Sequence, residues 1–175
     1  MTDAVYHVFN DLEGLRVAVE IERRGFEFYT RAMKLSADPD ARAMLRHLAQ
    51  EEQEHLSAFD ALYKQAAERA DQLGMPADYG MESSAFLSAL AADVVFPGGL
   101  SAFARGYGFD DPFALLMQAI QAEKDSILYY WECMMITKDP LARDTFHNII
   151  TQERDHLMDL QGEMVKMLAE RAQPD

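Results

Sequence analysis

The chain has 175 residues, 49% of them apolar, and carries 30 acidic against 16 basic residues, a formal net charge of −14. This length supports one core and predicts a single domain over residues 1–175, while an acidic balance without a basic stripe excludes nucleic acid and membrane surfaces as expected partners. A single cysteine excludes an intrachain disulfide, and the lack of a signal pattern or an apolar span of ~20 residues favours the cytoplasm.

Apolar residues recur every three or four positions in two regions of the first half of the chain, which is the period of an amphipathic helix. They predict a first helix over about 11–36 and a second over about 39–73. The pair Asp38-Pro39 supplies an N-cap side chain and a proline at the first helical position of the second helix. Gly74 ends that helix.

The same pattern returns in the second half of the chain, where Asp-Pro pairs precede predicted helices over about 112–137 and 140–170. Between the two helix pairs, residues 74–110 are rich in glycine, proline and apolar side chains, which favours a crossover packed on the bundle or on a partner subunit. No stretch alternates at period two, so strands are not expected. The predicted fold class is all-α, with two helix hairpins joined by a long crossover.

The two hairpins repeat each other at an offset of 101 residues. Self-similarity at a fixed offset indicates a duplicated unit. The offset aligns acidic, imidazole and tyrosine side chains in matched pairs: Glu22 with Glu123, Tyr29 with Tyr130, Glu52 with Glu153, and His55 with His156.

Each hairpin contains one aligned Glu-x-x-His motif, Glu52 with His55 and Glu153 with His156. Residues three apart share a helix face, so each motif presents a carboxylate and an imidazole to a common point. A further glutamate from the first helix of each hairpin faces the same axis. The candidate metal ligands are therefore Glu22, Glu52, His55, Glu123, Glu153 and His156.

Four buried carboxylates are strongly unfavourable unless their charge is neutralised, and two divalent ions would cancel it. Carboxylate-rich sites with one imidazole per metal suit iron or manganese, whereas structural zinc prefers thiolates. We therefore expect two iron ions per chain, for which manganese or zinc could substitute.

Several polar side chains beside these motifs are expected to face solvent, because helical rotation places them off the inward face. His47 lies roughly 80° from His55 around the second helix and could contact the site only indirectly. The other residues expected on the surface are Glu51, Glu54, Asp144, His147, Gln152 and Asp155.

The stretches EIERRGFEFY at 20–29 and AEKDSILYY at 122–130, together with the two motifs, resemble ferritin-like di-iron carboxylate proteins, most closely the rubrerythrin-like branch without a rubredoxin domain. The resemblance covers about residues 10–170. It implies a ferritin-like antiparallel four-helix bundle, iron ligation by the six candidates, and Tyr29 and Tyr130 as hydrogen-bond donors to ligand carboxylates. It implies no catalytic residue beyond the metal site and no organic cofactor.

The function implied by this resemblance is a di-iron oxidoreductase that reacts with peroxide or O2. Glu52 and Glu153 would bridge the metals, and the other two glutamates would be terminal ligands. An external protein would donate electrons, and we expect a homodimer. Rubrerythrins carry a further glutamate one turn after the third-helix ligand, whereas this chain has Ser126-Ile127 there.

Two other functions could use the same site. An iron-binding protein, or a ferroxidase or storage protein of ferritin type, would oxidise Fe(II) to pass it on, and storage would require a closed shell of subunits. Oxygenation or desaturation of an organic substrate would require an apolar channel. Phe26, Phe28 and Trp131 could line a channel, but apolar residues at helical spacing more commonly belong to a core.

Overall fold

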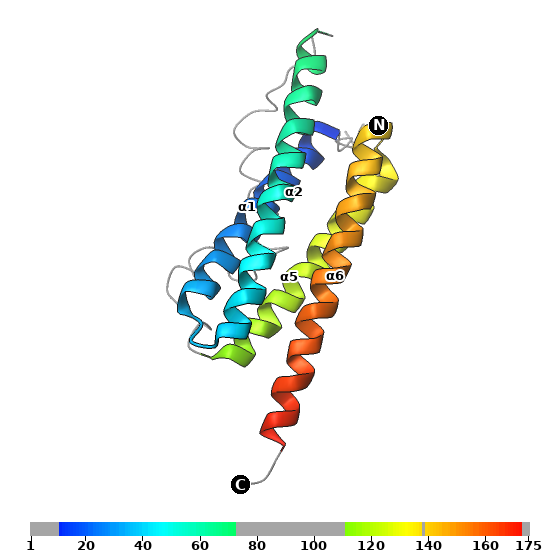
Figure 1. The fold of residues 1–175 in the computed structure, drawn as a ribbon. Coiled ribbons are helices and arrows are strands. Elements are labelled where there is room, and N and C mark those ends of the chain that lie inside the picture. The colour runs from blue at the N-terminus through cyan, green and yellow to red at the C-terminus, as the bar shows by residue number, and fades with distance from the viewer. Residues whose placement is uncertain (1–10, 73–110, 138, 173–175) are drawn as a thin grey trace, which may run out of the picture.

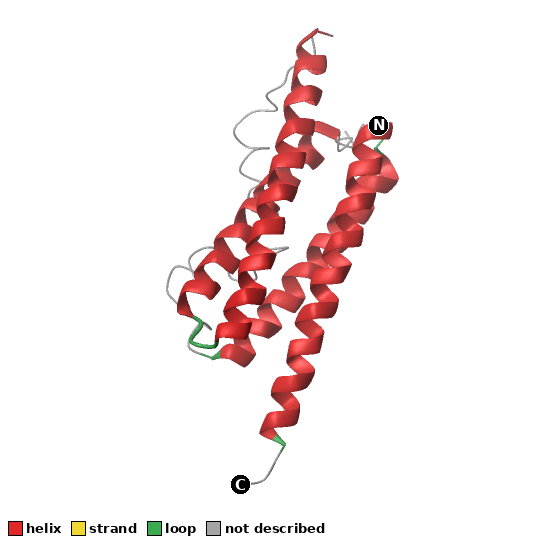
Figure 2. Ribbon diagram, viewed as in Figure 1, coloured by secondary structure: helices red, strands yellow, loops and turns green. Residues whose placement is uncertain are grey.

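The computed structural model describes residues 11–72, 111–137 and 139–172. These residues form four α-helices and no strand, which confirms the all-α prediction for the described part of the chain (Figure 2). The crossover predicted over 74–110 lies outside it. The helices are α1 (Asp11–Leu35), α2 (Pro39–Gln72), α5 (Pro112–Ile136) and α6 (Pro140–Arg171).

Three aspartates define where α2, α5 and α6 begin. Asp38, Asp111 and Asp139 each accept a hydrogen bond from the backbone N–H two residues later, at 3.0, 3.0 and 2.9 Å. The proline after each aspartate opens the helix, where its missing N–H leaves no intrahelical bond unmade. These starts set the register at which the polar side chains of neighbouring helices meet.

The helices form two hairpins, α1 with α2 and α5 with α6, which lie side by side (Figure 1). Between the hairpins, α1 contacts α5 and α2 contacts α6, so the order around the bundle is α1, α2, α6, α5. Each helix runs antiparallel to both of its neighbours (Figure 1). A side chain pointing to the bundle axis can therefore meet side chains from three other helices.

Two apolar clusters lie along the bundle, one on each side of a polar layer. On α1, Glu22 separates Ile21 of one cluster from Phe28 of the other, and on α2 and α6 the Glu-x-x-His residues likewise stand between residues of the two clusters. The first cluster includes Leu15, Ile21, Phe59, Tyr130, Phe146 and Ile150, and the second includes Phe28, Tyr29, Leu48, Leu116 and Leu160. Apolar packing on both sides isolates the polar layer from bulk water.

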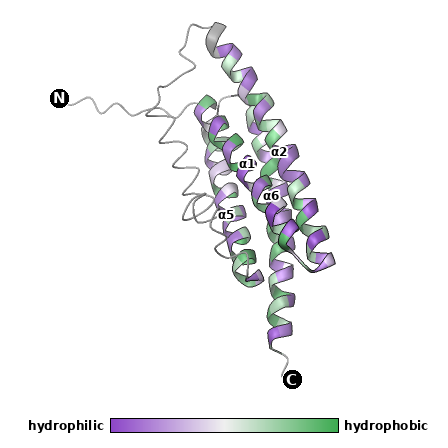
Figure 3. Ribbon diagram, turned by 90° about the vertical axis from the view of Figure 1, so that its left-hand side faces the viewer, coloured by the Kyte–Doolittle hydropathy of each residue, from purple (hydrophilic) through white to green (hydrophobic). Residues whose placement is uncertain are grey.

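Hydrophobic and hydrophilic residues alternate along all four helices, as expected for helices with one buried and one exposed side (Figure 3). Within the described ranges, no helix combines the length and the apolar character that crossing a bilayer requires.

Candidate metal centre

The polar layer brings together six ionisable side chains from all four helices. Their exposed fractions are no more than 4%, which is unusual for carboxylates and requires a neutralising partner. Glu22 extends from α1, Glu52 and His55 from α2, Glu123 from α5, and Glu153 and His156 from α6. The structure thus unites every ligand candidate predicted from the sequence.

The six side chains form two overlapping groups, each of which could hold a metal ion. In each group, one atom from each of four residues lies within 4.8 Å of the other three. Glu52 and Glu153 belong to both groups. The first group is Glu22, Glu52, His55 and Glu153, and the second is Glu52, Glu123, Glu153 and His156.

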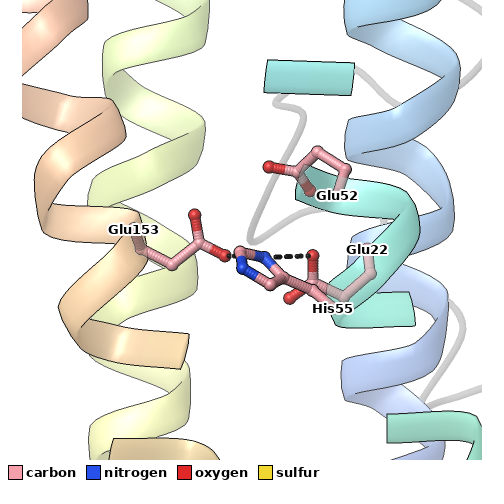
Figure 4. Close-up of side chains that lie close together, drawn as sticks. All are labelled: Glu22, Glu52, His55 and Glu153. Carbon is pink, nitrogen blue, oxygen red and sulfur yellow. Dashed lines mark ion pairs between the residues drawn. The ribbon is translucent and has the colours of Figure 1, made fainter. Parts of the chain in front are cut away.

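The two imidazoles direct the same nitrogen, Nδ1, toward the carboxylates. His55 Nδ1 lies 3.1 Å from Glu153 Oε1 and 3.5 Å from Glu22 Oε2 (Figure 4). His156 Nδ1 lies 3.0 Å from Glu153 Oε2 and 3.6 Å from Glu52 Oε1. The rings are stacked with their centroids 5.7 Å apart. Each Nδ1 can therefore act as a ligand while Nε2 points away from the centre.

Buried polar atoms without hydrogen-bond partners are concentrated in this centre. Within the described residues there are five such side-chain atoms, and four of them are Glu22 Oε2, His55 Nδ1, Glu153 Oε2 and His156 Nδ1. Buried polar groups are otherwise nearly always hydrogen-bonded. Oxygen and nitrogen lone pairs directed at one space from several helices suit a cation, so these residues fit the metal pair expected from the sequence.

Two buried tyrosines connect the hairpins at the centre. The hydroxyl of Tyr29 on α1 donates to Glu123 Oε1 on α5. The hydroxyl of Tyr130 on α5 donates to Glu22 Oε1 on α1, at 2.5 Å. Burial, reinforced by the neighbouring carboxylates, raises the pKa of both tyrosines well above its usual value, so both remain protonated donors.

The outer nitrogens of the histidines contact two residues for which the sequence predicts only solvated surface. His55 Nε2 lies 2.8 Å from Gln152 Oε1, and His156 Nε2 lies 2.9 Å from Glu51 Oε2. The prediction was incomplete because it counted rotation about one helix, whereas these side chains cross to the neighbouring helix. A signal was present, since residues 51 and 152 occupy equivalent positions in the repeat.

The remaining surface predictions agree with the structure. His47 is exposed and contacts Glu51 Oε2 through Nε2, at 3.1 Å. It therefore approaches the centre only indirectly. Glu54, Asp144, His147 and Asp155 are also exposed, and so is Gln152, although it contacts His55.

Gly25 is a further position beside the candidate centre that the sequence did not indicate. A Cβ atom there would lie 2.9 Å from Glu52 Cδ and still closer to Glu52 Oε2. The absence of a side chain therefore lets the Glu52 carboxylate lie against the backbone of α1. The available signal was a glycine inside a helical pattern, three residues after Glu22.

Without a metal, the carboxylates and imidazoles shift the pKa values of one another. Burial is the largest cause that raises the pKa values of Glu22, Glu52 and Glu123, and the Glu153 carboxylate is the next. The pKa of Glu123 is raised to about 8. Burial would lower the pKa of His55, but contacts with Glu153 and Glu22 raise it to about 11. Burial would raise the pKa of Glu153, yet contacts with both imidazoles lower it. Protons thus neutralise part of the charge that cations would otherwise balance.

These shifts predict that the metal-free protein loses stability as the pH rises from about 5 to about 11. Protonated Glu123 and His55 each stabilise the fold fully at pH values below their ordinary pKa values, which are 4.5 and 6.5. This contribution is lost as the pH rises through the pKa values in the folded protein, about 8 for Glu123 and about 11 for His55. Thermal unfolding of chelator-treated protein at several pH values measures this trend. Unfolding temperatures that increase over the same range would contradict it.

Comparisons of the chain with models of protein families, with curated proteins and with solved structures gave no match. The chemistry of the centre is therefore argued from its own residues.

Proposed function

We propose that the protein is a di-iron oxidoreductase of the ferritin-like class, similar to rubrerythrins, that reduces peroxide or O2 with electrons from an external donor protein. The observation that carries this proposal is the pair of four-residue groups that share two carboxylates in a buried layer. Sharing of ligands is expected where two ions act on one small molecule.

The composition of the two groups supports iron. Their four carboxylates balance two divalent cations, and each group adds one imidazole and no thiolate. Oxygen-rich ligand sets of this kind suit iron or manganese better than structural zinc. Glu52 and Glu153, which belong to both groups, would help to hold both ions, whereas Glu22 and Glu123 would each help to hold one. The bound iron would supply the redox chemistry.

The residues around the ligands orient them and exclude water. Tyr130 binds Oε1 of Glu22 and leaves Oε2 of the same carboxylate without a hydrogen bond, which orients that oxygen toward His55 Nδ1, 3.5 Å away. Tyr29 donates to Oε1 of Glu123, and this same oxygen lies 3.8 Å from His156 Nδ1. The apolar clusters on both sides strengthen these electrostatic contacts, because they lower the local dielectric constant.

One position distinguishes this centre from that of rubrerythrins. In the turn after Glu123, the buried Ser126 donates its hydroxyl to the backbone oxygen of Ala122 at 3.0 Å. This turn provides no further carboxylate toward the centre. We propose that the ligand set of this chain stays the same when the oxidation state changes.

The test is the metal content and peroxide reactivity of protein purified from iron-supplemented cells. We expect about two iron ions per chain, and rapid change of the visible spectrum when peroxide is added to the reduced protein. The control is a His55→Ala, His156→Ala double variant, which should lose iron. Less than one metal ion per chain, unchanged in the double variant, would contradict the proposal.

The same sample separates the proposed enzyme from an iron-storage protein. The proposal includes a homodimer, so the particle should have about twice the chain mass of 19.8 kDa. Iron retention without peroxide reactivity, in a particle of many subunits, would instead favour storage.

A further inference from the structure

We propose that the two metal positions are not equivalent, and that the position beside His156 binds a divalent ion more tightly than the position beside His55. This inference rests on the proposed metal centre. It assigns Glu51 and Gln152 as positioning residues that set the order in which the positions fill.

The difference lies in what each histidine contacts on its outer side. His156 Nε2 faces a carboxylate, Glu51 Oε2, at 2.9 Å. His55 Nε2 faces an amide oxygen, Gln152 Oε1, at 2.8 Å. A histidine that ligates through Nδ1 carries its proton on Nε2, so each ring must donate to its outer partner. One ring donates to a negative acceptor and the other to a neutral one.

The ligand residues of the two groups are matched in kind. Residues 51 and 152 are equivalent under the offset of 101 residues. Each group contains three carboxylates and one imidazole, and two of those carboxylates are common to both. A tyrosine hydroxyl holds the unshared carboxylate of each group. Gly25 and Ser126 are also equivalent positions that differ, but Gly25 lies against Glu52, which belongs to both groups. The outer acceptor, by contrast, differs between one group and the other.

A carboxylate acceptor makes imidazole a stronger ligand. The charge-assisted hydrogen bond draws the Nε2 proton toward Glu51 and increases the electron density at His156 Nδ1. Glu51 also adds a negative charge close to the second group. Loss of such an outer partner typically weakens metal binding by about 10–100-fold.

Glu51 is itself held in place by a second donor. His47, one turn earlier on α2, contacts the same oxygen, Glu51 Oε2, at 3.1 Å. The equivalent position in the second hairpin is Asn148. The asymmetry thus extends from the centre to the exposed side chain of His47 on α2.

The experiment is titration of the intact metal-free protein with Co2+, followed by calorimetry and by the visible absorption of the bound ion. We expect two binding steps. Glu51→Gln should weaken the tighter step by about 10–100-fold and change its absorption, and Gln152→Glu should strengthen the weaker step. His156→Ala should remove the tighter step, which assigns it to that histidine.

Glu54→Gln is the matched control, because it removes one exposed carboxylate from the same helix. Equal effects of Glu51→Gln and Glu54→Gln would overturn the inference, since only net charge would then matter. Two Co2+ ions bound per chain with one affinity that neither Glu51→Gln nor Gln152→Glu changes would also overturn it, while leaving the metal centre intact. Absence of Co2+ binding to the unaltered protein would overturn the metal centre itself.

Discussion

Glu52→Gln is expected to make the metal-free protein more stable and to prevent it from holding two metal ions. Glu52 is 4% exposed, and burial, Glu153 and Glu22 together raise its pKa well above the usual value. Glutamine has the same size and carries no charge, so it removes this unfavourable interaction. Single stabilising substitutions typically contribute about 0.5–2 kcal/mol. Each kcal/mol raises the unfolding temperature of a chain of this size by roughly 2–4 °C.

The expected loss of metal binding follows from the position of Glu52 in both groups. Each ion would lose one of its three carboxylates, and the centre would carry one negative charge fewer. Thermal unfolding with and without added Fe2+ separates the two effects. The unaltered protein should gain stability from the metal, whereas Glu52→Gln should start higher and gain little.

Glu54→Gln is again the appropriate control, because Glu54 carries the same charge two residues away on the exposed side of α2. It should change neither the unfolding temperature of the metal-free protein nor the gain on adding metal. A Glu52→Gln variant that is less stable without metal would show that the Glu52 charge stabilises the fold. A variant that still binds two ions would show that the two positions do not share Glu52.

The sequence predicted the helices and the members of the centre because both depend on local rules. Asp-Pro pairs mark helix starts through hydrogen bonds that each aspartate makes with its own helix. The ligand candidates follow from the duplication, since a Glu-x-x-His motif that recurs at a fixed offset is far less ambiguous than one occurrence. Asp144 and His147 have the same spacing without a counterpart, and both are exposed.

What the sequence could not show depends on distances between helices. Periodicity gives the angle of a residue about its own helix and nothing about how close the next helix lies. Glu51 and Gln152 stand off the inward face, yet each is within 3 Å of a histidine on the other hairpin. The pairing of each tyrosine with the glutamate of the opposite hairpin likewise required the packing of α1 against α5.

Gly25→Ala is expected to weaken metal binding at both positions while leaving the fold intact. The added Cβ would lie 2.9 Å from Glu52 Cδ, so the Glu52 side chain would have to leave its place between the two groups. Displacing a shared ligand should reduce affinity at least about tenfold, the lower end of what altered ligand orientation causes. In a helix interior alanine is more favourable than glycine by about 1 kcal/mol, so the metal-free protein should not be destabilised.

Gly162→Ala provides the comparison that isolates the contact with Glu52. Gly162 also lies inside a helix, α6, but a Cβ there would meet no atom within 4 Å. This variant should gain the same helix stabilisation and keep its metal affinity, as measured by Co2+ titration and by thermal unfolding. Equal affinities in the two variants would mean that Glu52 can ligate from another rotamer. Weaker binding in Gly25→Ala alone would show that α1 must approach Glu52 without a side chain for the centre to form.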